Sequence, residues 1–387
     1  MIKNIGVVGA GAMGSGIAQV AAMAGMNVFI FDSFETAILK ARSTIQISLE
    51  KAEDKGKIPR GESIQILNRI RFVEDMSEFK NCDLVIEAVI ENAEVKQNLF
   101  RELENIVSIK TILATNTSSL SITSIASACQ HPERVIGIHF FNPAPLMPLV
   151  EIIPGITTDP LLAGEVKTLI SGWGKIPVIA KDVPGFIVNR IARPYYGEAI
   201  RIYEEGIADF ATIDWAMKEF GSFRMGPFEL MDMIGNDINY TVTETVWKQY
   251  FFEPRYKPSL TQKRLFEAGY FGKKSGRGYY DYAEGRIQPE PTKDPDKGKY
   301  IYTRVLAMLI NEAAEALYWN VATRDDIDLA MTKGVNYPKG LLKWADDIGI
   351  INVLELISDL HHTYHEERYR PSILLNKMAD ENKTFYD

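Results

Sequence analysis

Short apolar runs and longer amphipathic stretches alternate along the first half of the chain. Residues 2–8 form a β-branched run that stops at Gly9. Residues 14–25 are the small and apolar residues of a helix packed closely on a sheet, and residues 27–31 form a second apolar run. This order predicts two strands of a parallel sheet, joined by a right-handed crossover through the helix.

The same alternation continues to about Val178. A long helical pattern rich in Lys and Glu runs through residues 35–67, and two shorter ones lie at 95–107 and 122–128. Strand-like runs occur at residues 71–73, 83–89, 111–115, 135–140 and 150–153. Strands that alternate with helices predict a doubly wound α/β domain, to which we assign residues 1–180.

The pattern changes after residues 181–185. Helical periodicity runs through residues 186–203, 212–220 and 228–250, and clear strand patterns disappear. The remainder of the chain is therefore predicted to be all-helical.

An internal repeat organises this helical region. Residues 189–198 match residues 303–312 at an offset of 114 positions, and after one deletion residues 255–259 match 368–372. The same offset relates Ala199/Ala313, Asp214/Asp328, Ala216/Ala330, Met217/Met331, Gly226/Gly340, Asp232/Asp346 and Gly235/Gly349. We predict a helical domain present in two copies, at 181–284 and 296–387. The charged, Pro-rich segment 284–299 is the expected linker.

The composition is that of an ordinary soluble protein. The 387 residues include 43 Lys+Arg and 51 Asp+Glu, so the net charge is −8. This balance argues against nucleic acid or an anionic membrane as the main partner. Cys82 and Cys129 are the two cysteines, too few for a disulfide scaffold or a Cys-rich zinc site. With no secretory signal pattern, a cytoplasmic location is expected.

The segment Gly9-Ala-Gly11-Ala-Met13-Gly14 follows a predicted strand and opens a predicted helix. In this setting the glycines allow a tight turn, close approach of a pyrophosphate and close helix packing. Asp32 ends the second strand, where a carboxylate accepts hydrogen bonds from a ribose hydroxyl and repels a 2′-phosphate. The combination predicts a Rossmann-type domain that binds NAD through Gly9, Gly11, Met13, Gly14 and Asp32. A Gly-rich turn that only packs a helix on the sheet is the alternative.

His139 and Glu151 are candidates for acid/base chemistry. His139 lies at the end of one apolar run and Glu151 lies 12 residues later in the next. A carboxylate that orients an imidazole fixes its tautomer and supports its charged form. The alternatives are a satisfied core histidine and a turn-capping glutamate. A group of three histidines lies near the C-terminal end, at His361, His362 and His365. We expect a solvated helix there and not a metal site, because the sequence offers no third ligand on the helix face that His361 and His365 share.

Four segments together resemble the L-3-hydroxyacyl-CoA dehydrogenase family. They are Gly137-Ile-His-Phe-Phe-Asn-Pro143, Asp182-Val-Pro-Gly-Phe-Ile-Val-Asn-Arg190, Asn116-Thr-Ser-Ser119 and Phe271-Gly-Lys-Lys-Ser-Gly276. The likeness spans about residues 1–282, and residues 296–387 resemble the second helical copy of longer members.

The resemblance implies roles for individual residues. His139 would be the catalytic acid/base with Glu151 as its partner, Ser118 would bind the reacting 3-oxygen, and Asn189 would position the acyl group. Without the family, Ser118 fits a strand-end cap, and Asn189 and Asn142 fit helix or turn caps.

The resemblance also implies binding residues that the sequence alone does not select. Glu91, Lys96, Asn142 and Lys274 would contact NAD, and Ser48 and Lys55 would contact coenzyme A. As bare sequence, these charges fit solvated helix faces equally well. Lys51 and Lys57 compete with Lys55 for the same role, and Glu53 and Asp54 reduce the local positive field.

These observations predict an NAD-dependent (S)-3-hydroxyacyl-CoA dehydrogenase. The alternatives are a dehydrogenase of a free 3-hydroxy acid on the same scaffold and a non-catalytic, crystallin-like relative. The expected partner is an acyl-CoA substrate, with enoyl-CoA hydratase on a separate polypeptide and a monomeric or homodimeric enzyme. Thr303 stands where the first copy has Asn189, so the second copy is expected to be structural.

Overall fold

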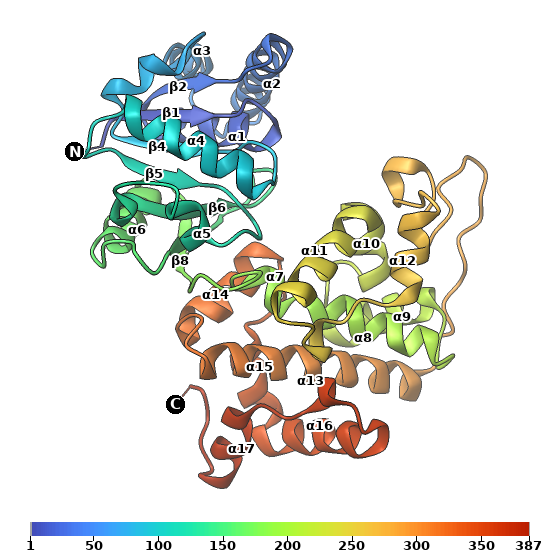
Figure 1. Cartoon of the computed structure of the whole chain (residues 1–387). Helices are drawn as coiled ribbons and strands as arrows, with labels where there is room; N and C mark the ends of the chain where they lie inside the picture. The colour runs from blue at the N-terminus through green and yellow to red at the C-terminus, as the bar shows by residue number, and fades with distance from the viewer. Residues whose placement is uncertain (1, 387) are drawn as a thin grey trace. The chain divides into compact units, whose positions relative to one another are not determined.

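A computed structural model describes residues 2–386. The chain divides into two compact units, with the boundary in the sequence between Phe186 and Ile187 (Figure 1). The first unit is an α/β domain and the second is helical. This order of elements confirms the fold class predicted from the sequence.

A single eight-stranded sheet forms the centre of the first unit, in the order β3-β2-β1-β4-β5-β6-β7-β8. The strands are β1 Asn4–Val8, β2 Asn27–Phe31, β3 Ile70–Phe72, β4 Leu84–Glu87, β5 Ile112–Thr115, β6 Val135–Phe140, β7 Leu149–Pro154 and β8 Ile176–Ile179. All neighbouring pairs are parallel except β6 and β7, which are antiparallel. The chain order reverses between β1 and β4, where doubly wound sheets bind their ligands.

Helices cover both faces of this sheet. They are α1 Ala12–Met23, α2 Glu35–Asp54, α3 Glu62–Asn68, α4 Ala93–Ile106, α5 Ile122–Ala126 and α6 Leu162–Gly172. One core cluster joins α1, α2, α3 and α6 to the sheet, and a second joins α4 and α5 to it. Strands β1, β4, β5 and β6 in the centre of the sheet are buried on both faces, as continuous apolar runs in a parallel sheet require.

Several features of this unit differ from the sequence prediction. Helix α6 and strand β8 were not among the predicted elements. The helical stretch predicted at 35–67 is two helices, because the chain turns after Asp54 and Gly61 adopts a φ of +84° before α3. The antiparallel pairing of β6 with β7 was not anticipated. It arises because the segment between these strands reverses direction without a crossover helix.

The second unit is a bundle of eleven α-helices within the described residues. They are α7 Val188–Ile191, α8 Arg193–Glu204, α9 Phe210–Gly221, α10 Pro227–Ile234, α11 Asn236–Gln249, α12 Leu260–Glu267, α13 Pro295–Tyr318, α14 Arg324–Gly334, α15 Leu341–Ile348, α16 Ile350–Tyr364 and α17 Ile373–Asp380. The long α13 packs against α8 and α9 as well as α15, α16 and α17. It begins at Pro295 with Asp294 as its cap, so the end of the predicted linker is helical.

Residues that repeat at an offset of 114 occupy equivalent structural positions. The Asp214 carboxylate accepts hydrogen bonds from the backbone amides of Phe228 and Glu229 at the start of α10. Asp328 does the same for the backbone amides of Leu342 and Lys343 at the start of α15. In both places a glycine lies beside the aspartate, where a Cβ atom would come within 2.4 Å of it. The repeated Asp and Gly residues therefore build the same helix start twice.

Candidate functional site

The carboxyl ends of five parallel strands bring most of the candidate residues to one edge of the sheet. Gly9 follows β1, Asp32 follows β2, Glu87 ends β4, Ser118 follows β5, and His139 lies near the end of β6. Strands β1, β2, β4, β5 and β6 run in the same direction, so all five residues lie at the same edge. This is where an open parallel sheet binds its ligand.

The glycine loop has the geometry that a bound pyrophosphate needs. Gly9 adopts a φ of +100°, which favours glycine, and a Cβ atom on Gly14 would lie 1.8 Å from the carbonyl oxygen of Gly9. Gly11 differs, because a Cβ atom there would meet nothing within 4 Å. It is exposed at the start of α1, where backbone amides and the helix dipole attract a phosphate. Gly9 and Gly14 therefore shape the turn, and Gly11 leaves room for a ligand.

Asp32 is held beside this loop. Its Oδ2 atom accepts a hydrogen bond from the backbone amide of Ala10 at 2.7 Å, and its Oδ1 atom accepts one from Phe34 at 2.9 Å. A carboxylate has about four acceptor sites. Two amides therefore orient the Asp32 side chain and leave acceptor capacity for two ribose hydroxyls, which fits NAD.

His139 and Glu151 are direct cross-strand partners. They oppose each other in the antiparallel register of β6 and β7, and His139 Nδ1 lies 2.7 Å from Glu151 Oε2. Both side chains are buried. The 12-residue spacing noted in the sequence places them opposite each other because β6 and β7 form a hairpin-like pair.

Two aromatic rings flank the imidazole of His139. The ring centroid of Phe141 lies 4.6 Å from that of His139, and the centroid of Phe186 lies 5.9 Å from it. Phe186 is fully buried and is the last residue of the first unit. The imidazole is thus held at Nδ1 by a carboxylate and bordered by apolar rings.

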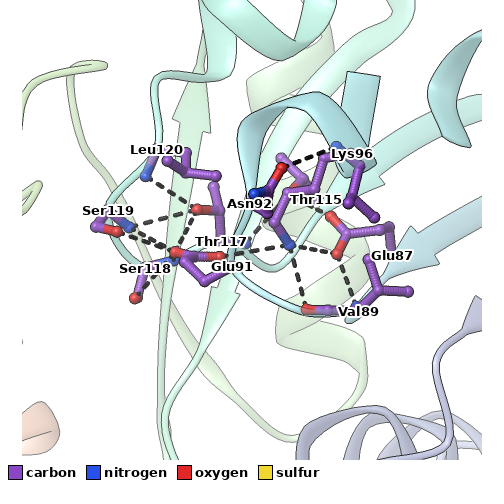
Figure 2. Close-up of polar contacts among 11 residues, drawn as sticks. Glu87, Val89, Glu91, Asn92, Lys96, Thr115, Thr117, Ser118, Ser119 and Leu120 are labelled. Carbon is purple, nitrogen blue, oxygen red and sulfur yellow. Dashed lines mark hydrogen bonds and ion pairs between the residues drawn. The ribbon is translucent and has the colours of Figure 1, made fainter. Parts of the chain in front are cut away.

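A second buried charge network joins the end of β4 to α4 and the loop between them (Figure 2). The ammonium of Lys96, with 1% of its side chain exposed, pairs with the fully buried carboxylate of Glu87. Glu87 also accepts hydrogen bonds from the Thr115 hydroxyl at 2.7 Å and the Val89 amide at 2.8 Å. On its other side, Lys96 lies 3.4 Å from Glu91 Oε2. Lys96 therefore bridges two carboxylates.

Glu91 in turn organises the loop that carries Ser118. Its Oε1 atom accepts hydrogen bonds from the Thr117 hydroxyl at 2.7 Å, the Ser118 amide at 2.9 Å and the Ser118 hydroxyl at 3.2 Å. Burial raises the pKa of Glu91, but the Lys96 ammonium and the hydrogen bonds from residues 117–119 outweigh it, so the pKa lies below its usual range. Glu91 is thus an anion that draws the 117–119 loop towards α4 (Figure 2).

The remaining candidates of the first unit lie further from these contacts. Ser48 is half-buried on α2, and Lys55 is exposed at the C-cap of that helix. The neighbouring Glu53 carboxylate is turned towards α3, where it accepts hydrogen bonds from the amides of Gly61 and Ser63. Asn142 is exposed directly after β6.

Asn189 and Lys274 belong to the second unit. Asn189 is half-buried on α7, and its carbonyl oxygen accepts a hydrogen bond from Arg193 Nε at 2.7 Å. Lys274 forms an ion pair with Asp237 of α11. The functional roles of Asn189 and Lys274 remain predictions.

Within residues 2–386, no three His, Cys, Asp or Glu side chains are grouped closely enough to hold a metal ion. None of the helices over the same residues is long and apolar enough to cross a membrane.

Comparison with known families decides the identity of both units. The family model described as "3-hydroxyacyl-CoA dehydrogenase, NAD binding domain" matches residues 4–183. The model of the same family's C-terminal domain matches twice, at residues 185–282 and 300–385. The chain belongs to the 3-hydroxyacyl-CoA dehydrogenase family. It is therefore a member of a family of NAD-dependent oxidoreductases, and an acyl-CoA substrate fits that family.

Individual members of the 3-hydroxyacyl-CoA dehydrogenase family resemble the chain over different lengths. The 3-hydroxyadipyl-CoA dehydrogenase of Escherichia coli K12 is 37% identical, with 98% of each chain covered. A crystal structure of 3-hydroxybutyryl-CoA dehydrogenase from the same species has a TM-score of 0.92 at 37% identity, covering 98% of this chain and 99% of that one. The (S)-3-hydroxybutyryl-CoA dehydrogenase of Ralstonia eutropha has a TM-score of 0.71 at 39% identity, covering 73% of this chain and 100% of that one.

Sequence reasoning did not select Glu87, Thr117 or Phe186. Glu87 gave one usable signal, because it is a lone acid at the end of the apolar run 84–87, at the edge of a parallel sheet where ligands bind. Thr117 and Phe186 lie within segments 116–119 and 182–190, which carry the family resemblance, but nothing in the sequence indicates their contacts, since their partners lie far away in the sequence and only the folded chain brings them together.

Proposed function

We propose that this protein catalyses the reversible, NAD-dependent oxidation of (S)-3-hydroxyacyl-CoA to 3-oxoacyl-CoA. The observation that carries the proposal is the buried His139–Glu151 pair, 2.7 Å apart, at the same sheet edge as the Gly9–Gly14 loop and Asp32. A base at that edge stands on the side of the sheet where the dinucleotide binds.

Glu151 accepts the Nδ1 hydrogen of His139, which leaves Nε2 as the basic nitrogen. In the oxidation, His139 removes the proton of the 3-hydroxyl group, and Glu151 stabilises the imidazolium that forms. NAD, when bound, supplies the acceptor for the hydride that leaves C3. In the reverse direction, the His139 imidazolium returns its proton to the 3-oxygen.

Ser118 and Asn189 are proposed to act on the acyl group. A developing alkoxide is stabilised by hydrogen-bond donors held in place within a site closed to water. Ser118 donates to Glu91 at 3.2 Å without substrate, so its hydroxyl must turn from Glu91 to the 3-oxygen when the substrate binds. Asn189 has a half-buried side chain at the start of the second unit and is assigned the positioning of the acyl carbonyl.

The proposed NAD contacts are the Gly9–Gly14 loop including Met13, Asp32, Glu91, Lys96, Asn142 and Lys274. Ser48 and Lys55 are proposed to contact coenzyme A. Lys55, the C-cap of α2, follows Ser48 by seven positions, or about two helical turns, so the two residues lie on the same side of the helix. Because the Glu53 carboxylate accepts hydrogen bonds from the backbone at the start of α3, it does not compete with coenzyme A for the Lys55 ammonium.

We further propose that 181–284 and 296–387 are two copies of one helical domain, of which only the first serves the active site. Thr303 stands at the position equivalent to Asn189. Its hydroxyl donates a hydrogen bond to the backbone of α13, and it has no side-chain amide that could position an acyl group. A cytoplasmic location is part of the same proposal.

The test of substrate class is NADH oxidation with acetoacetyl-CoA, compared with free acetoacetate and with NADPH as cofactor. The proposal predicts turnover with the CoA ester and NADH, and at least 100-fold lower kcat/KM with free acetoacetate. Comparable turnover of free acetoacetate would favour the free 3-hydroxy acid dehydrogenase. Binding of NADH without turnover of any acyl-CoA from four to sixteen carbons would favour a non-catalytic relative.

A further inference from the structure

Phe186 has an unusual backbone conformation for an aromatic residue. Its φ is +46°, in the left-handed region, and only 1% of its surface is exposed. Left-handed backbone brings the Cβ atom of a non-glycine residue too close to the following carbonyl oxygen and is strained. Such a conformation persists only where the surroundings hold it, and these places cluster at functional sites.

The segment before Phe186 provides that restraint. The amide of Phe186 donates to the carbonyl oxygen of Val183 at 3.0 Å, closing a turn with Pro184 second and Gly185 third. Gly185 has a φ of +75°, as the third position of a type II turn requires. The turn fixes the backbone at Phe186 and therefore the direction of its Cα–Cβ bond.

The turn itself is tied to the sheet edge through Asp182. The Asp182 carboxylate accepts hydrogen bonds from the backbone amides of Ile122 at 3.0 Å and Thr123 at 2.8 Å, and from the Thr123 hydroxyl at 2.7 Å. These bonds attach residues 182–186 to the start of α5. Phe186 is therefore fixed in the first unit, next to the strand that carries His139.

The ring of Phe186 meets the imidazole of His139, with centroids 5.9 Å apart and planes tilted by 58°. Phe141 borders the same imidazole at 4.6 Å. The hydrogen bond to Glu151 holds one ring nitrogen, but a single bond leaves the imidazole free to tilt about it. The two phenyl rings pack against the imidazole, which is 6% exposed, on the sides towards which it could tilt.

We propose that Phe186 is a positioning residue for proton transfer by His139. The inference rests on the proposed function, since it assigns Phe186 a role only if His139 is the acid/base. The strained turn at 183–186 places an aromatic ring where it restrains the direction of His139 Nε2. Because a misplacement of about 1 Å in a reacting group costs up to about 100-fold in rate, loss of this ring slows the proton transfer.

The test compares Phe186→Leu with Phe140→Leu. Phe140 is buried to a similar extent and neighbours His139, but its ring stacks on Trp173 at a centroid distance of 6.4 Å. Both variants lose a buried aromatic ring, so stability is lowered in both. Phe186→Leu is expected to lower kcat roughly tenfold, with the KM for NADH unchanged within twofold and a larger solvent deuterium isotope effect on kcat. Phe140→Leu is expected to leave kcat per folded molecule and the isotope effect as in the parent.

Equal kcat values and equal isotope effects in the two variants would overturn the inference, as would a lower kcat without a larger isotope effect. If Phe186→Leu does not fold, Phe186→Met fills the space with a flexible side chain and carries the same expectations. His139→Gln in the same assay separates the two claims. If His139→Gln keeps its activity, the proposed function fails. If it loses activity while Phe186→Leu behaves like Phe140→Leu, only the role of Phe186 fails.

Discussion

Arg190 and Glu312 form a buried ion pair, with Nε and Oε1 2.6 Å apart, although 122 positions separate them in the chain. Arg304 and Glu198 form a second pair with the same atoms and the same distance. At the repeat offset of 114, Arg190 is equivalent to Arg304 and Glu198 to Glu312. Each half of the helical unit therefore supplies an arginine to the glutamate of the other half, as two copies related by a two-fold axis do.

The reciprocal pairs are expected to carry a large share of the stability of the helical unit. Glu312 also accepts a hydrogen bond from the Tyr256 hydroxyl at 2.6 Å. Glu312→Ala leaves the buried Arg190 charge unpaired, which costs about 3–5 kcal/mol of the unfolding free energy, measured by urea denaturation. The control is Glu267→Ala, which breaks the exposed Arg264–Glu267 pair and is expected to cost under about 1 kcal/mol. Equal losses in the two variants would contradict the account.

Truncation after Glu284 removes Glu312 and α13, which packs against α8 and α9. The truncated protein then exposes the apolar surface that α13 covers. We expect it to associate into dimers or aggregates, measured by light scattering after size-exclusion chromatography. A stable, active monomer of residues 1–284 would show that the second half is dispensable for covering this surface.

Substitution of Gly11 by alanine should weaken NADH binding, whereas substitution of Gly14 by alanine should lower the stability of the protein. Gly14→Ala places a Cβ atom 1.8 Å from the Gly9 carbonyl oxygen, so the turn must deform and the protein loses stability. Gly11→Ala meets no protein atom, so it should fold with the parental Tm but bind NADH at least tenfold more weakly. Thermal unfolding and NADH fluorescence titration separate the two effects. Unchanged NADH affinity in Gly11→Ala would contradict the placing of the pyrophosphate at this loop.

Asp214 should make the stability pH-dependent. Burial raises the pKa of its carboxyl group to about 7, although the hydrogen bonds from Tyr280 and from the amides at the start of α10 lower that pKa. Between pH 4 and 7 the folded protein then keeps a proton that the unfolded chain has lost. The unfolding free energy from this group therefore falls as the pH rises through that window, by on the order of 4 kcal/mol. Urea denaturation at several pH values should show a flatter profile for Asp214→Asn, and an unchanged profile would contradict the assignment.

Some features were open to prediction because local sequence carries them. The apolar run 135–140 is β6 with the same bounds, and the glycine loop has the expected turn. The spacing of His139 and Glu151 identified the pair, but their contact depends on the antiparallel register of β6 and β7. No local pattern specifies that register.

Other features depend on residues that meet only in the folded chain. Lys96 has the sequence context of an exposed residue at a helix start, yet it is buried because Glu87, on the neighbouring β4, neutralises its charge. The repeat identified Arg190 and Arg304 as equivalent positions. It did not show that each arginine pairs with the glutamate of the other half, since that exchange requires the two halves to pack face to face.

The most direct test of the central claim is the kcat of His139→Gln with acetoacetyl-CoA and NADH. The matched control is His131→Gln, because His131 also lies close to a glutamate, Glu133, but is exposed. We expect His139→Gln to lose at least 100-fold in kcat while it binds NADH with parental affinity, and His131→Gln to keep full activity. A His139→Gln enzyme that folds, binds NADH and retains kcat within a few fold of the parent would contradict the role of His139 as the acid/base.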